Sequence, residues 1–161
     1  MKTLSTALII VALLISSTGG AQVPQPDMMI RLSGEAYMGN NIYNLDGAGQ
    51  MKSLTVLPKA AAIYFLIAQN DGNATDNLTV KGTGSVTGWA VKYYDAATGG
   101  LDITSAVVAG SWSTGLLARG AYKVLRVVVT PGITAAANSA YPVLITATSM
   151  SSTLKKDAVK A

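Results

Sequence analysis

Short runs in which hydrophobic and polar residues alternate follow one another along this chain. The clearest run covers residues 121–130, where Leu125, Val127 and Val129 alternate with residues that face the other way. Alternation with a period of two is typical of a β-strand with one buried face, so we expect these three side chains to be buried. A Pro-Gly pair at 131–132 ends the run, because proline has no N–H to donate and glycine favours a turn.

Residues 60–69 form the most hydrophobic stretch after the N-terminal segment, and their length suits either a buried helix or a central strand. The flanks favour the strand: Pro58 precedes the stretch and an Asn-Asp-Gly-Asn run at 70–73 follows it. Several β-branched and aromatic residues within it point the same way. Residues 76–81 are then expected to return as the second strand of a hairpin.

The same patterns predict the remaining elements. In 89–94, Trp89, Val91 and Tyr93 share the face that suits a core better. In residues 51–57, hydrophobic and polar residues alternate roughly. The other expected strands, full or short, are 27–32, 42–43, 101–108, 143–148 and 155–161.

About seven or eight strands at a spacing of about 8–12 residues predict an all-β fold, an immunoglobulin-like sandwich of antiparallel strands. No convincing amphipathic helix interrupts this pattern. We expect one domain over 27–161, preceded by an extended, Pro-containing leader at 22–26.

The N-terminal segment is typical of a signal peptide. Met1 and Lys2 give a positive start, residues 4–15 are apolar, and Gly19-Gly20-Ala21 fits a small-residue cleavage site. Cleavage before Gln22, which removes Met1–Ala21, would leave a protein that is secreted or held at the cell surface. An uncleaved N-terminal anchor is the alternative. A lipid-anchored lipoprotein is excluded because no cysteine follows the apolar run.

The composition excludes several kinds of chemistry. The chain has no Cys and no His, so it has no disulfides, no zinc site of the Cys/His type and no Ser-His-Asp or Cys-His catalytic machinery. The net charge is +4, but the basic residues are scattered and do not interleave with aromatic residues. A nucleic-acid partner is therefore not expected, and no cofactor is indicated.

The chain resembles the immunoglobulin-like repeats of large secreted bacterial proteins, akin to the CARDB modules and to the Ig-like domain associated with alpha-galactosidases. The resemblance covers essentially all of 27–161 and implies a fold and an extracellular setting, without catalytic residues. The segments that carry it are 27–31, 39–44, 62–64 to 69–72, 88–95, 117–120, 127–131 and 143–149.

The chain departs from these modules in two turns and in copy number. Such modules usually have Pro-Gly before the strand at 121, where this chain has Arg119-Gly120. They commonly have Gly before the strand at 60, where this chain has Pro58-Lys59. The relatives often occur in tandem, whereas this chain carries one copy.

Aromatic residues offer one candidate binding site. Trp89, Trp112, Tyr93 and Tyr94 together suit a platform on which sugar rings stack. The alternation instead favours Trp89 and Tyr93 as core residues, with Trp112 packed beneath a loop. Tyr94 and Trp112 are therefore the candidate ligand contacts.

The acidic candidates are weaker. Asp71, Asn73 and Asp76 loosely resemble a Ca²⁺ loop, but a closing Glu is absent and a hairpin turn accounts for the same residues. Asn73 and Asn77 also begin glycosylation sequons. No metal site is predicted.

Glu35, the only Glu in the chain, is the candidate for a glycosidase-style carboxylate pair, with Asp46 or Asp95 as its partner. Nothing in the sequence indicates that these carboxylates converge, so we expect no enzyme.

The sequence therefore favours a non-catalytic exported module with a structural, adhesive or assembly role at the cell surface. Its partners would be copies of itself, or other surface proteins, bound through sheet edges. The alternative is an accessory module that binds polysaccharide through Tyr94 and Trp112. A hydrolase that uses Glu35 is the remaining hypothesis.

Overall fold

The computed structural model describes residues 20–161, so all but the last two residues of the predicted signal peptide lie outside the described part. Within 20–161 the chain forms eight strands and one short helix. In chain order they are β1 Pro26–Arg31, β2 Ala62–Asn70, β3 Asp76–Gly82, β4 Trp89–Tyr94, α1 Thr104–Ala109, β5 Trp112–Leu117, β6 Tyr122–Pro131, β7 Leu144–Ser149 and β8 Lys156–Lys160.

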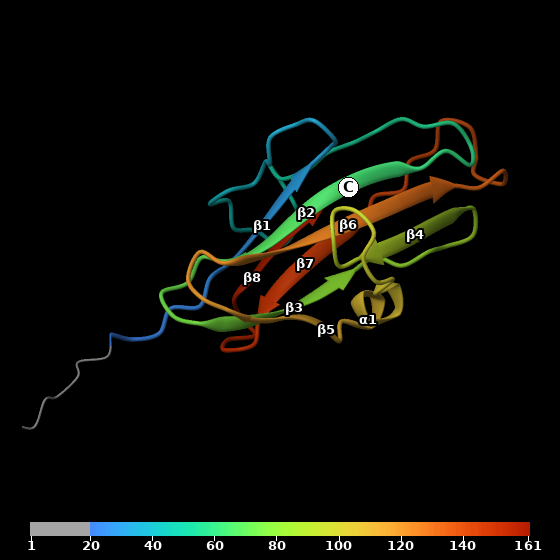
Figure 1. Cartoon of the computed structure of the whole chain (residues 1–161). Helices are drawn as coiled ribbons and strands as arrows, with labels where there is room; N and C mark the ends of the chain where they lie inside the picture. Colours follow the sequence, from blue (N-terminus) through green and yellow to red (C-terminus); the bar gives the residue numbers. More distant parts are fainter. Residues whose placement is uncertain (1–19) are drawn as a thin grey trace, which may run out of the picture.

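The strands form two antiparallel sheets of four strands each. One sheet has the order β1-β2-β6-β4 and the other has the order β5-β3-β7-β8. The two sheets pack face to face (Figure 1). The predicted all-β sandwich is confirmed.

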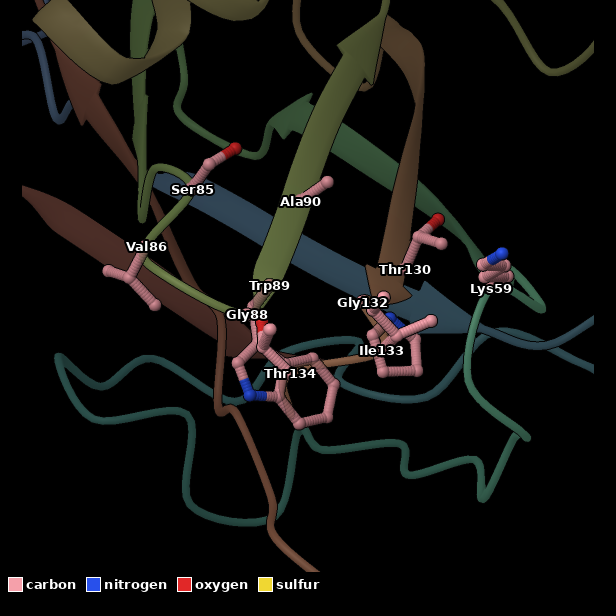
Figure 2. Close-up of a pocket in the computed structure, with 11 residues that line it drawn as sticks. Lys59, Ser85, Val86, Gly88, Trp89, Ala90, Thr130, Gly132, Ile133 and Thr134 are labelled. Carbon is pink, nitrogen blue, oxygen red and sulfur yellow. The ribbon is translucent and has the colours of Figure 1, made fainter. Parts of the chain in front are cut away.

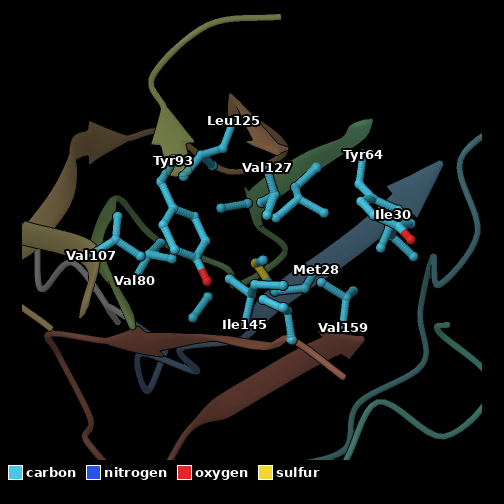
Figure 3. Packing of buried hydrophobic residues seen from close by; sticks show 14 of the residues in the cluster. Met28, Ile30, Tyr64, Val80, Tyr93, Val107, Leu125, Val127, Ile145 and Val159 are labelled. Carbon is cyan, nitrogen blue, oxygen red and sulfur yellow. The ribbon is translucent and has the colours of Figure 1, made fainter. Parts of the chain in front are cut away.

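The core fills the space between the two sheets, and the predicted inward faces supply much of it. Leu125 and Val127 of β6 are fully buried and Val129 is nearly so, as their alternation predicts. Val91 and Tyr93 of β4 are also buried. Figure 3 shows the Tyr93 ring among the other buried side chains of the core. The packing of apolar side chains from both sheets removes their surface from water and stabilises the sandwich.

The strand predicted at 76–81 is present as β3, but the predicted hairpin with β2 is wrong. β2 pairs with β1 on one edge and with β6 on the other, so no edge of β2 is left for β3. The chain instead crosses to the second sheet after Asn70. The buried Asn70 amide holds this crossover by donating to the carbonyl oxygens of Ala74 and Leu117, both at 2.8 Å.

The short strand proposed at 101–108 is also wrong, because this segment contains α1. The Asp102 carboxylate accepts hydrogen bonds from the Thr104 backbone N–H at 3.0 Å and hydroxyl at 2.6 Å. Gly110, at a φ of 75°, ends the helix. Burial of Val107 against the core outweighs the preference of β-branched residues for strands.

Two other weak candidates form little regular structure. Residues 42–43 form no strand. Residues 51–57 contain only a one-residue parallel bridge, between Met51 and Lys160 of β8. This segment therefore lies beside the sandwich without extending a sheet.

We expect Leu125→Ala to lower the free energy of unfolding by about 2–5 kcal/mol, because it opens a cavity at the centre of the core. Urea denaturation followed by tryptophan fluorescence measures this loss. The matched control is Leu154→Ala, at a side chain that is 91% exposed, which should change stability by less than about 0.5 kcal/mol. Equal effects of the two substitutions would contradict the assignment of the core.

Candidate functional site

The sandwich has four edge strands: β1 and β4 in one sheet, and β5 and β8 in the other. An edge strand exposes backbone N–H and C=O groups that can pair with a strand of another chain. Whether these groups are already satisfied within the molecule decides which edge is open to a partner.

The outer edge of β4 is closed by hydrogen bonds. The Ser85 hydroxyl accepts the Val91 N–H at 2.9 Å and donates to the Val91 carbonyl at 3.3 Å. The Thr104 hydroxyl oxygen accepts the Tyr93 N–H at 2.9 Å, and the Ile103 N–H donates to the Tyr93 carbonyl at 2.9 Å. These bonds occupy the groups that an added strand would need.

The outer edges of β1 and β8 are covered by the long segment between β1 and β2. Ile30 and Met38 exchange both backbone hydrogen bonds, each at 2.9 Å. The Lys160 N–H donates to the Gln50 carbonyl at 3.0 Å, and the Lys52 N–H donates to the Lys160 carbonyl at 3.0 Å. The segment from 38 to 52 therefore covers both strands on this side of the sandwich.

Two buried carboxylates lie where β1 and β8 meet, and Asp157 bonds the strands together there. The Asp157 side chain accepts hydrogen bonds from the N–H of Met28 at 2.6 Å and from the Gln50 amide at 2.8 Å. Asp27 accepts the Asn41 N–H at 3.1 Å, while its Oδ1 has no donor among the described residues. Burial raises the pKa of Asp27 to about 6, against the opposing hydrogen bond from Asn41 and with a further contribution from the Asp157 charge.

The outer edge of β5 differs from the other three. Within 20–161, β3 on the inner side is its strand partner, and the Leu117 carbonyl at its end accepts the Asn70 amide. The strand, WSTGLL, carries no charged residue, and Leu116 is 80% exposed. A register irregularity opposite Leu78 is held by the Thr114 hydroxyl, which accepts the Leu78 N–H at 3.1 Å.

The two aromatic residues proposed as ligand contacts lie on different sheets. Tyr94 ends β4 and is half-buried, with the Arg126 guanidinium 4.3 Å from the centre of its ring. The carbonyl oxygens of Ala97 and Gly99 hold that guanidinium, each at 2.9 Å. Trp112 begins β5, and it is half-buried because it packs against the core.

Each candidate catalytic carboxylate has its own local partner. Glu35 forms an ion pair with Lys52 at 2.7 Å, and this partner lowers the pKa of Glu35. Asp46 accepts the N–H of Ala48, and Asp95 accepts the N–H of Leu101. A general acid for glycoside cleavage needs a raised pKa, which is the opposite of the shift at Glu35.

The oxygen atoms of the proposed Ca²⁺ loop are directed to separate partners. Asp76 is buried and accepts the hydroxyl groups of Ser149 and Ser151, whereas Asp71 accepts the hydroxyl of Tyr43. Among residues 20–161, no group of three or more His, Cys, Asp or Glu side chains is placed to hold a metal ion.

Two hollows flank Trp89 at the end of the sandwich where β4 begins and β6 ends. The first, of about 510 Å³, is lined by the turn before β2 and by the residues that precede β4 and follow β6 (Figure 2). The second, of about 630 Å³, lies between residues 51–58 and 135–142. Trp89 and Pro131 line both hollows.

The sequence interpretation missed this site because the alternation in β4 placed Trp89 in the core. Trp89 is only half-buried, since the core opens where the strand begins. Its ring stacks on Tyr141, with the ring centres 5.7 Å apart. The signal available in the sequence was the position of Trp89 directly after a glycine-rich loop.

No family model matches the chain, and no curated protein matches it either. In the described part of the chain, no helix has the length and apolar character needed to cross a membrane.

We expect the stability of the protein to fall as the pH rises from about 4 to 7. The folded-state pKa of Asp27 lies above the unfolded value, so the stability present in acid is lost as the pH passes about 6. Asp27→Asn removes this charge and should raise the melting temperature at pH 7.5 by roughly 3–6 °C, with little gain at pH 4. Thermal unfolding across this pH range measures both curves.

The matched control is Asp46→Asn, at an exposed carboxylate with no part in this cluster. Its pH profile should follow that of the unsubstituted protein. Some pH dependence should remain in Asp27→Asn, because burial also raises the pKa of Asp157. An unchanged profile in Asp27→Asn would contradict the assignment.

Proposed function

We propose that the protein is a non-catalytic, exported module of the immunoglobulin-like type, with a structural, adhesive or assembly role at the cell surface. The observation that carries the proposal is the open outer edge of β5, because the other three edges of the sandwich are covered. Export follows from the predicted signal peptide at 1–21.

Strand addition at β5 is the mechanism that this edge favours. An added strand would donate and accept backbone hydrogen bonds along β5 and bury the exposed Leu116 side chain. A second copy of the chain is a suitable partner, because two β5 edges can pair antiparallel about a two-fold axis. No like charges would oppose each other in that pairing, since β5 has no charged residue.

The proposal predicts self-association that depends on concentration. Size-exclusion chromatography with light scattering on residues 22–161 should detect dimers or polymers as the concentration rises. Leu116→Lys should shift the population to monomer, because a charge on an edge strand disfavours edge-to-edge pairing.

The control is Leu154→Lys, which adds the same charge at an exposed turn and should leave association unchanged. A protein that stays monomeric at high concentration and binds no cell-envelope fraction would refute the assembly role. Equal loss of association in the two variants would instead indicate a general effect of charge.

A second candidate function is an accessory carbohydrate-binding module. The observation that favours it is that Trp89, a half-buried indole, lines two hollows. Trp89 therefore replaces Tyr94 and Trp112 as the candidate ligand contact. Aromatic faces beside polar rims suit sugar rings.

A further inference from the structure

We propose that the hollows on either side of Trp89 form one binding site for an acidic polysaccharide, with Lys59 as the residue that binds its carboxylate groups. This inference rests on the second candidate function and names the class of carbohydrate. It is independent of the β5 edge, because no residue of β5 lines either hollow.

The two hollows are suited to a linear ligand. They share Trp89 and Pro131, so their linings meet at these two residues. Figure 2 shows Lys59 on the turn before β2 and Trp89 at the start of β4, as parts of the same lining. A polymer of sugar rings matches such an extended site better than a compact molecule does.

The charge of the first hollow favours an anion, because Lys59 is the charged residue of its lining. Lys52 and Lys160 line the second hollow together with Ala161, which carries the α-carboxylate of the printed chain. Lys52 is already paired with Glu35 at 2.7 Å. Lys59 and Lys160 are in no ion pair among the described residues.

The polar groups of the lining favour a sugar over an acyl chain. The Thr134 hydroxyl lines the first hollow, while the polar side chains of Ser53 and Asn138 line the second. These groups can bond sugar hydroxyls beside the apolar surface of Trp89, whereas an acyl chain would leave them without partners.

The backbone at Lys59 gives a separate reason to assign it a function. Residues 57–60 form a tight turn, in which the Ala60 N–H donates to the Leu57 carbonyl at 3.0 Å. Lys59 follows Pro58 in this turn at a φ of 69°, a conformation that glycine adopts far more readily. Unfavourable conformations of this kind are concentrated at functional sites.

The test separates fold from function with Lys59→Gly. Glycine relieves the backbone strain, so this variant should melt at the same or a higher temperature than the unsubstituted protein. It should bind polygalacturonate about tenfold more weakly, since a hydrogen bond to a charged group is lost. Lys59→Arg, which keeps the charge, should bind nearly as well as the unsubstituted protein.

Binding is measured by tryptophan fluorescence at fixed ionic strength. The chain has two tryptophans, so all titrations use a Trp112→Phe background in which Trp89 alone reports. The charge control is Lys123→Ala, at an exposed residue of β6 that lines neither hollow. Dextran serves as the neutral polysaccharide.

Tighter binding of polygalacturonate than of dextran, weakened by Lys59→Gly and unaffected by Lys123→Ala, would support the inference. Equal binding of the two polymers would preserve the carbohydrate-binding function but overturn the acidic ligand. Binding of neither polymer would overturn both the carbohydrate-binding function and the acidic ligand. Equal weakening by Lys123→Ala and Lys59→Gly, or full binding by Lys59→Gly, would overturn the role of Lys59.

Discussion

The packing of one sheet against the other is the interaction on which the rest of this structure depends. The chain has no cysteine, so no disulfide supports it, and the apolar side chains between the sheets must hold the sandwich together. β6 contributes Leu125 and Val127 to this layer while it pairs with both β2 and β4. The sheets also determine where edges occur, and each edge must be covered or left available.

Covering the edges accounts for most of the irregular chain. The segment between β1 and β2 bonds to both β1 and β8, whereas Ser85 and Thr104 satisfy the outer groups of β4. This covering has a local cost: Asp27 and Asp157 are buried beside each other, and burial raises the pKa of both carboxyls. Against this background, the bare edge of β5 is the exception, which is why it supports an assembly role.

The sequence was sufficient for the strands and their inward faces, because alternation along one strand is a local property. It failed where distant residues decide the outcome. β3 left β2 because β1 and β6 occupy both edges of β2, and neither neighbour is visible in the sequence of the turn. Likewise, α1 formed where β-branched residues favoured a strand, because Val107 is buried in the core. Trp89 has the right alternation for a core residue, but the position of the core's end depends on loops far along the chain.

The turn before β2 combines these local and distant effects. In the local sequence, Lys59 occupies a turn position at which glycine is preferred. The local sequence alone gives no reason for this departure. The fold places this turn at the rim of the first hollow. The Lys59 N–H donates there to the carbonyl of Pro131, at 2.7 Å. That bond fixes the turn against the end of β6, so the position of the Lys59 backbone is set by the sheet. A cation held there at a conformational cost, in a lining that holds no acidic residue, is better explained by the proposed anionic ligand than by stability.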